Sequence, residues 1–383
     1  MDDRQFDSLS RRVGGSPLSR LPRRGLIAAL GGVAVANALL LEDGAEAKKK
    51  KNKKKCKNEG QGCDKQKCKK QDKKCCCNNL KCNNGVCEGK GGSCPTKVTF
   101  QNFFANVGDG ATSSPWGITY DSDGYVYIAD KTKSRITIYY ADGSNYSQFG
   151  SNGTGNGQFK TPFGIAFQSS NNRLVISDKG QTDVYKKLRR FRTDGSDPNI
   201  IGVDNLTQPV GVSVDSNGRI WVVDATDPGE IYLFDSGGSE LASWSPGGSG
   251  KLNLPQGIAV YKDSDDNATY VYVADTGNNR IVKFQYTGNS SSGLSYVTAA
   301  GSGGSGTSSF NTPVDIALDK CGNLWVTDQL NNRVQVLDKN LNFKTRFTVA
   351  QMIAPAGIAL SGSTLYVVNN GSNNAQRFSL SKE

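Results

Sequence analysis

The sequence predicts an all-β protein, a six-bladed β-propeller, preceded by a small disulfide-rich module. Two observations predict the ring of blades. A Pro-x-Gly motif followed by alternating apolar residues occurs six times, once with Asp in place of Gly, and short turns rich in Gly, Asn and Asp separate the apolar segments. A third observation predicts the module, because nine of the ten cysteines lie between Cys56 and Cys94.

The repeats define residues 98–383 as the propeller. The prolines that begin the six units are Pro115, Pro162, Pro209, Pro255, Pro313 and Pro355. They lie 42 to 58 residues apart, and a period near 45 with three or four short strands per unit is typical of a propeller. The last unit ends after its third strand, whereas the segment Val98–Asn106 precedes the first unit without a partner. We therefore predict that this N-terminal strand completes the sixth blade and closes the ring.

The pattern P-x-G-I-A-V…Y-V-A-D-x-x-N-N-R-I resembles the NHL repeat of six-bladed propellers. The resemblance implies a binding or scaffold role. Related propellers of the gluconolactonase kind use a Glu, two Asn and an Asp around a divalent cation, which implies a cation-dependent hydrolase as the alternative function. The domain contains only Glu230, Glu240 and Glu383, and none begins an inner strand. We therefore expect a binding protein more than an enzyme, with no catalytic residue, metal or cofactor.

An Asp at the end of the second strand and an Arg five residues later recur through the repeats. We call this repeated pair the staple. The predicted staple residues are Asp130, Arg135, Asp178, Asp224, Asp275, Arg280, Asp328 and Arg333, with Asn369 at the Asp position of the sixth unit. By alignment the Arg position holds Lys187, Glu230 and Ala375 in the other units. Because a repeated element has the same surroundings in each blade, we predict that it stabilises a turn and does no chemistry.

A ligand site should lie where the repeat is broken, at the mouth of the central channel. There the middle residue of the motif varies. The residues predicted to form this face are Trp116, Phe163, Val210, Gln256, Val314, Asp315 and Ala356, of which Asp315 replaces the repeated Gly. Trp116 and Phe163 on neighbouring blades predict an aromatic patch for a protein or glycan partner. The alternative is that the two rings only plug the channel.

Two further segments carry charges that suggest binding. The acidic stretch at 263–267 could hold calcium, although a longer hairpin loop is the favoured interpretation. The basic run at 186–192 could contact an anion, although a solvated strand face is favoured. The chain contains no His, which excludes Ser-His-Asp and Cys-His catalysis and imidazole metal ligands.

Residues 1–47 predict an export signal. Arg23 and Arg24 precede an apolar run that ends near Leu41, and Ala45–Ala47 reads as a cleavage site. The segment resembles a bacterial twin-arginine (Tat) signal. An uncleaved membrane anchor is the alternative. Either way we expect the rest of the chain to be secreted or associated with the cell envelope.

Residues 48–97 predict a basic module held together by disulfides. The candidate disulfide cysteines are Cys56, Cys63, Cys68, Cys75, Cys76, Cys77, Cys82 and Cys87, and the run from Cys76 to Cys87 resembles a knottin-like domain. Cys94 is left over; it could remain free, pair with another chain or bridge to Cys321.

The lysine tract Lys48–Lys55 predicts attraction to an anionic envelope surface. Residues 1–97 hold 23 Lys and Arg against 10 Asp and Glu, so the net charge of +11 belongs to this part of the chain. We therefore expect no nucleic-acid partner for the propeller, and a monomer.

Overall fold

The computed structural model describes residues 80–83, 86–89, 95, 97–106, 114–180, 187–202, 205–288, 290 and 292–381. The chain divides into two compact units, Met1–Gly89 and Lys90–Glu383. The predicted export signal and the tract Lys48–Lys55 lie outside the described residues. In the part of the chain that is described, no helix is long and apolar enough to cross a membrane.

The first unit contains one described β-hairpin. Strands β1 (Leu80–Asn83) and β2 (Val86–Gly89) are antiparallel, and Cys82 stands opposite Cys87 in their register. The other candidate disulfide cysteines, Cys56, Cys63, Cys68, Cys75, Cys76 and Cys77, lie outside the described residues.

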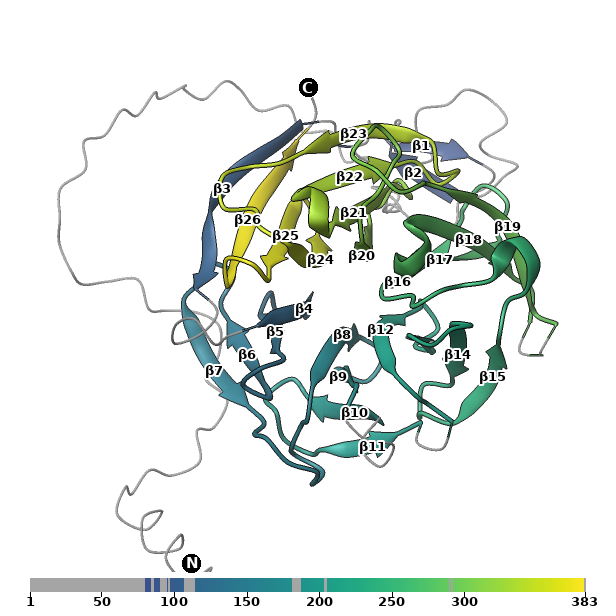
Figure 1. Ribbon diagram of the computed structural model, residues 1–383. Helices are drawn as coiled ribbons and strands as arrows, with labels where there is room; N and C mark the ends of the chain where they lie inside the picture. Colours follow the sequence, from purple (N-terminus) through teal and green to yellow (C-terminus); the bar gives the residue numbers. More distant parts are fainter. Residues whose placement is uncertain are drawn as a thin grey trace, which may run out of the picture. The chain divides into compact units, whose positions relative to one another are not determined.

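The second unit is an all-β propeller with six four-stranded antiparallel sheets in its described residues, arranged in a ring with their first strands at the centre (Figure 1). Blade one contains β4 (Pro115–Tyr120), β5 (Val126–Asp130), β6 (Arg135–Tyr139) and β7 (Asn145–Phe149). Blade two contains β8 (Pro162–Gln168), β9 (Arg173–Asp178), β10 (Lys187–Arg192) and β11 (Asn199–Ile201). Blade three contains β12 (Pro209–Val214), β13 (Ile220–Asp224), β14 (Glu230–Phe234) and β15 (Glu240–Trp244).

Blades four and five have short 3-10 helices in the loops between their second and third strands. Blade four contains β16 (Ile258–Lys262), β17 (Thr269–Asp275), η3 (Thr276–Asn278), β18 (Arg280–Tyr286) and β19 (Leu294–Ala300), and η2 (Gly248–Gly250) precedes it. Blade five contains β20 (Pro313–Leu318), β21 (Leu324–Asp328), η4 (Gln329–Asn331), β22 (Arg333–Leu337) and β23 (Phe343–Phe347).

The sixth blade confirms the predicted closure of the ring. It contains β24 (Pro355–Ser361), β25 (Thr364–Asn369) and β26 (Asn374–Ser381), and its outer strand is β3 (Lys97–Asn106). The register runs from Lys97 opposite Ser381 to Asn106 opposite Asn374. The first and last strands of the propeller therefore share one sheet, which ties the two ends of the ring together and completes the sixth blade to four strands.

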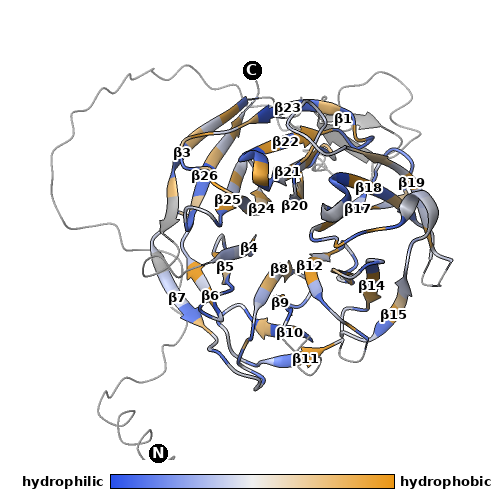
Figure 2. Cartoon of the chain, viewed as in Figure 1, coloured by the Kyte–Doolittle hydropathy of each residue, from blue (hydrophilic) through white to orange (hydrophobic). Residues whose placement is uncertain are grey.

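The hydrophobic core is distributed between neighbouring blades. Each cluster combines residues of adjacent sheets; for example, Leu188 of blade two packs in one cluster with Ile220 and Phe234 of blade three. Figure 2 shows hydrophobic residues on strands of every blade rather than in one element. Apolar side chains on both faces of each sheet are thus buried between that blade and its two neighbours.

The Gly of the Pro-x-Gly motif is required by the close approach of the inner strands. A Cβ at Gly257 would lie 2.5 Å from the carbonyl oxygen of Val314 in the next blade, closer than real Cβ contacts. The same crowding against the next inner strand is found at Gly117, Gly164, Gly211 and Gly357. The narrow channel is therefore a direct consequence of this repeated glycine.

Candidate functional site

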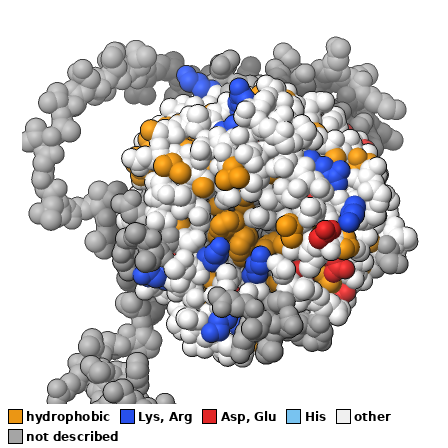
Figure 3. Space-filling model, in the orientation of Figure 1, with side chains coloured by type: hydrophobic (Ala, Val, Ile, Leu, Met, Phe, Trp, Pro, Cys, Tyr) orange, Lys and Arg blue, Asp and Glu red, His pale blue; other side chains and the backbone are white. Residues whose placement is uncertain are grey.

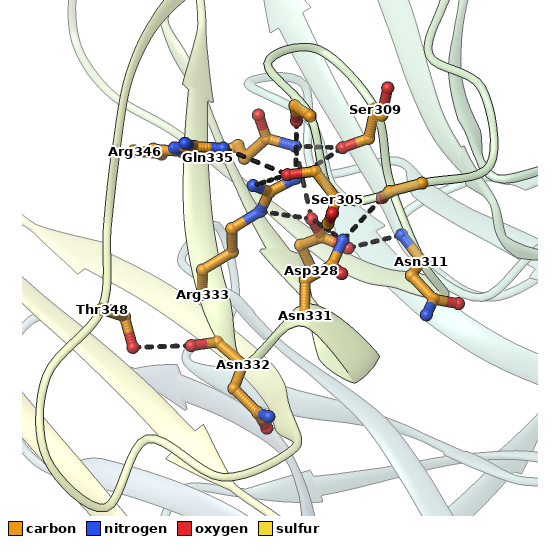
Figure 4. A network of polar contacts seen from close by, with 12 residues as sticks. Ser305, Ser309, Asn311, Asp328, Asn331, Asn332, Arg333, Gln335, Arg346 and Thr348 are labelled. Atoms are coloured by element: carbon orange, nitrogen blue, oxygen red, sulfur yellow. Dashed lines mark hydrogen bonds and ion pairs between the residues drawn. The ribbon is translucent and has the colours of Figure 1, made fainter.

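Where the Asp–Arg pair is present, it holds the loop that leads into the inner strand of the same blade. In blade five, Asp328 accepts hydrogen bonds from the Asn311 N–H at 2.7 Å and the Asn331 side chain at 2.8 Å, and pairs with Arg333 Nε at 2.7 Å. Arg333 then donates to the Ser305 carbonyl at 2.7 Å and to other carbonyls of the same loop (Figure 4). The carboxylate binds the N–H side of the loop and the guanidinium binds its carbonyl side.

Blade four repeats the arrangement. Asp275 accepts the Asn253 N–H at 2.7 Å and pairs with Arg280 Nε at 2.7 Å, while Arg280 donates to the Lys251 carbonyl at 2.7 Å. In blade one the pair is looser, because Arg135 Nε lies 3.5 Å from Asp130.

Blade two contains a staple that alignment missed. Lys187 stands opposite Asp178, but the guanidinium comes from Arg189, whose Nε lies 2.9 Å from Asp178 and whose Nη1 donates to the Gly155 carbonyl at 2.8 Å. Arg189 is buried, so the favoured interpretation of the basic run as a solvated strand face is wrong at this residue. Its position two residues along the strand, on the same face as the expected Arg, is the signal that could have identified it.

Blades three and six lack the Arg. Asp224 accepts the Gln208 N–H at 2.5 Å, and Glu230 opposite it accepts a hydrogen bond from Tyr232 at 2.6 Å. In blade six Asn369 donates to Asn374 at 2.9 Å, and the register places Asn374, not Ala375, opposite Asn369. The five staple aspartates are fully buried. Carboxylates engaged in this way are suited to fixing loops and have no access to a substrate.

The varied residues of the motif meet at the channel mouth. A cavity of about 30 Å³ lies there, and its walls include Trp116, Phe163, Val210, Gln256, Val314 and Asp315. Ala356 is buried but does not line this cavity; its carbonyl accepts the Thr327 hydroxyl at 2.7 Å. The Trp116 and Phe163 rings pack 4.5 Å apart with their planes tilted by 40°. The cavity has room for one or two water molecules, far below the several hundred Å³ of a typical small-molecule site.

Two lysines lie beside this aromatic pair, and sequence reasoning missed them. Lys131 Nζ lies 4.8 Å from the Trp116 ring centroid and 5.8 Å from that of Phe163, and Lys179 Nζ lies 5.8 Å from that of Phe163. Burial lowers the pKa of Lys131. Figure 3 shows hydrophobic side chains at the centre of this view with Lys and Arg side chains beside them.

The sequence contains a signal for these two lysines at the position that follows the staple Asp of each blade. That position holds Lys131 and Lys179 in blades one and two, but Ala225, Thr276, Gln329 and Asn370 in the other four. Blades one and two therefore differ from the other four at two positions: the middle residue of the Pro-x-Gly motif is aromatic, and the residue after the staple Asp is Lys.

Asp315 closes the gap between blades five and six. Its carboxylate accepts the Ile316 N–H at 2.9 Å and the Ile358 N–H at 3.0 Å. Burial raises the pKa of Asp315 to about 6, while the two hydrogen bonds act in the opposite direction. Both carboxylate oxygens of Asp315 accept backbone N–H groups, so the Asp that replaces the repeated Gly links the inner strands of blades five and six.

The channel mouth does not fit a divalent cation. Among the described residues that line it, the one carboxylate is that of Asp315, whose two oxygens already accept backbone N–H groups. Throughout the described residues, no group of three or more His, Cys, Asp or Glu could hold a metal ion. A hard cation takes six or more oxygen ligands, several of them carboxylates in most protein sites.

The acidic loop at 263–267 is bound by a lysine. Lys339 Nζ lies 2.9 Å from Asp263 and also pairs with Asp265, and Asp266 accepts a hydrogen bond from Tyr270 at 2.6 Å. The ammonium group takes the place that a calcium ion would need, so these residues act as a hairpin loop pinned to blade five.

A second cavity, of about 520 Å³, lies at the opposite end of the inner strands. Its walls include Leu318 and Leu360 at the ends of β20 and β24, together with Pro95 and Lys320. The neighbouring Cys321 is disulfide-bonded. All nine other cysteines of the chain lie between Cys56 and Cys94.

The chain is similar to known propellers. The sequence profile of the SMP-30/Gluconolactonase/LRE-like region matches residues 117–370. Human NHL repeat-containing protein 3 is 27% identical over 199 residues, which cover 47% of this chain and 52% of the human protein. The chain thus spans about half the length of this relative.

Among solved structures, a gluconolactonase from Xanthomonas campestris is 15% identical with a TM-score of 0.55, covering 76% of this chain and 96% of that one. A chain of the nidogen/laminin complex is 18% identical with a TM-score of 0.51, covering 66% and 87%. At these identities the structures show the fold alone. Because the family profile covers more than half of the chain, the protein belongs to the SMP-30/Gluconolactonase/LRE-like family, with repeats of the NHL type.

Proposed function

We propose that the protein is a binding or scaffold propeller that recognises a protein or glycan partner at the channel mouth of blades one and two. The observation that carries this proposal is the packing of Trp116 against Phe163, which leaves a cavity of only about 30 Å³. A closed mouth with an aromatic residue at its surface suits contact with a macromolecule better than enclosure of a small substrate.

A cation-dependent hydrolase is the alternative that family membership favours. The donor set disfavours it, since the described mouth residues offer one carboxylate that is already engaged by two backbone N–H groups. The staple aspartates are no substitute, because they are buried and bound to their own loops.

Capture of partners from the envelope of the protein's own cells tests the proposal. We expect Trp116→Ala to abolish capture of a partner that the full-length protein retains. Tyr146→Ala is the matched control, because Tyr146 is an aromatic residue of the same blade that is 51% exposed on the outer strand. Equal capture by both variants would contradict the proposed face.

Metal analysis and a sugar-lactone hydrolysis assay on the same preparation test the alternative. Stoichiometric divalent metal together with hydrolysis that is lost on chelation would overturn the binding proposal. We expect neither.

We further propose that the protein is exported as a monomer and localised by the basic module. The cysteine density before the propeller and the disulfide bond at Cys321 support an oxidising compartment. Lys48–Lys55 would supply attraction to an anionic envelope surface. Mass measurement of the mature N-terminus tests the export signal: a start near Lys48 is expected after cleavage, and a cytoplasmic protein that starts at Met1 would contradict export.

A further inference from the structure

The chain contains five Asn-Gly pairs, of which Asn84–Gly85 lies outside the described residues. An asparagine side chain cyclises readily before glycine, because a residue without a Cβ leaves its own backbone nitrogen uncrowded. That nitrogen must be free to attack. In three of the described pairs it is engaged, since the glycine N–H donates to a backbone carbonyl: Gly153 to Phe159 at 3.0 Å, Gly218 to Asp215 at 2.9 Å and Gly371 to Ile353 at 3.0 Å.

The remaining pair, Asn156–Gly157, has no such protection. Both residues are exposed, and within the described part of the chain neither the Gly157 N–H nor the Asn156 side chain takes part in a hydrogen bond. By contrast, the Asn152 side chain accepts a hydrogen bond from Lys160 Nζ at 3.2 Å. The backbone nitrogen of Gly157 is therefore available to attack the neighbouring side-chain amide.

The Asp-Gly pairs of the propeller follow the same rule. They cyclise by the same route, and in each described pair the glycine N–H donates to the carbonyl three residues before it: Gly124 to Asp121 at 3.2 Å, Gly143 to Tyr140 at 2.9 Å and Gly195 to Arg192 at 2.9 Å. The tight turns thus protect every Asn-Gly and Asp-Gly pair of the described residues except Asn156–Gly157.

The unprotected pair lies in a turn that the blade-two staple holds. The Gln158 N–H donates to the Gly155 carbonyl at 3.0 Å, so Asn156 and Gly157 are the two central residues of the turn. The Gly155 carbonyl also accepts a hydrogen bond from Arg189 Nη1 at 2.8 Å. A change in the length of this turn would therefore disturb a contact of the buried Arg189.

We propose that Asn156 is a site of spontaneous deamidation. The Gly157 nitrogen attacks Cγ of Asn156, and the new N–Cγ bond closes a succinimide ring. The Cγ–Nδ2 bond breaks, and ammonia leaves with the proton of the Gly157 amide. Water then opens the ring at either carbonyl to give aspartate or isoaspartate, so the reaction needs no enzyme and no oxidant. The inference does not depend on the proposed binding function.

The products should weaken the loop that leads into blade two. Isoaspartate adds one methylene group to the backbone between Gly155 and Gln158, which moves the Gly155 carbonyl relative to Arg189. The buried guanidinium then loses an acceptor, which costs stability. Both products also add a negative charge to the loop.

Peptide mass spectrometry of the full-length folded protein, incubated at mildly alkaline pH, tests the inference. We expect deamidation at Asn156 to be about tenfold faster than at Asn152, Asn217 or Asn370, because a backbone hydrogen bond must open first at those three. The same measurement in denaturant is the control for sequence effects. The difference should shrink there, since unfolding removes the protecting bonds.

Gly157→Ala is the matched variant. A Cβ at this position would meet only Pro198 Cγ, at an ordinary contact distance of 3.9 Å, so the variant should fold. Its methyl group crowds the attacking nitrogen. We therefore expect slower deamidation at Asn156, unchanged rates at the other three pairs, and a higher Tm than wild type after equal incubation. Thermal unfolding before incubation checks the fold of the variant.

Three outcomes would overturn the inference. Equal rates at the four pairs of the folded protein would mean that the hydrogen bonds do not decide the site. Faster reaction at Asn152, Asn217 or Asn370 would assign the site elsewhere. Deamidation of Gly157→Ala at the wild-type rate would exclude attack by the Gly157 nitrogen.

Discussion

Blades one and two differ from blades four and five at the face where the inner strands begin. Blades four and five have well-formed Asp–Arg staples at 2.7 Å. The described mouth loops 276–279, 301–312 and 329–332 contain no charged residue, and the loop that leads into blade four contains the single lysine Lys251. Blades one and two have Trp116, Phe163 and four lysines on the same face. One part of the ring thus keeps the repeated architecture, whereas the other departs from it at the face where we propose that a partner binds.

The largest expected effect comes from opening the ring on which both regions depend. Deletion of residues 98–106 removes nearly all of β3 and leaves β26 without its partner strand. We expect a loss of about 5 kcal/mol or more, equivalent to a fall in Tm of about 10 °C. Calorimetric or circular-dichroism melting measures it. An unchanged Tm would show that the closing strand is dispensable.

Breaking a staple should reduce stability without affecting recognition. Asp328→Ala leaves the buried Arg333 without its carboxylate, and we expect a cost of about 4 kcal/mol in the free energy of unfolding. Trp116→Ala should show the reverse pattern, with a smaller loss of stability and loss of partner capture. Denaturant unfolding and envelope capture on both variants make the comparison. If Asp328→Ala abolished capture at a temperature where it is folded, the division between the two regions would be wrong.

Asp315 should make stability depend on pH. Its pKa is raised to about 6 in the folded protein, so the native state binds more protons than the unfolded state between about pH 4 and pH 6. Its contribution is therefore greatest below pH 4 and falls by about 3 kcal/mol as pH rises through 6.

Denaturant unfolding from pH 4 to pH 7 measures this effect as the difference between wild type and Asp315→Asn. The control is Asp142→Asn. Hydrogen bonds from Ser144 lower the pKa of Asp142, so its contribution is lost only below about pH 4. Asp142→Asn should therefore give a profile parallel to wild type from about pH 4 to pH 7. Parallel pH profiles for wild type and Asp315→Asn would contradict the assignment.

The smallest effect is expected at Cys321. We expect Cys94 to be its disulfide partner, because the adjoining residues Pro95 and Lys320 line one cavity. Cys321→Ser should cost about 1 kcal/mol, less than a typical disulfide, since the β3–β26 ladder already holds this end of the chain. Mass spectrometry of non-reduced peptides identifies the bond. A Cys321 peptide linked to a cysteine before Cys94 would contradict the pairing.

The fold could be predicted from the sequence because the same pattern of strand and turn residues recurs in each blade. Five Pro-x-Gly motifs, the Pro-x-Asp of the fifth unit and the unpaired segment Val98–Asn106 predicted six closed blades. The same local reasoning failed at Arg189, because alignment by sequence distance placed Lys187 at the staple, whereas the side chain that reaches Asp178 comes from two residues further along the strand. In blade six it selected Ala375 where the register places Asn374.

The sequence by itself determined the class of fold, because strand alternation, turn residues and a fixed period are properties of neighbouring residues. It also drew attention to Trp116, Phe163 and Asp315 as departures from the repeat. Only the tertiary structure decided what these departures do, since their contacts cross between blades. Phe163 packs against Trp116 from the preceding blade, Asp315 binds the Ile358 N–H of the next one, and Lys339 of blade five occupies the acidic loop of blade four. Such contacts depend on how neighbouring blades pack against each other, which no local pattern encodes.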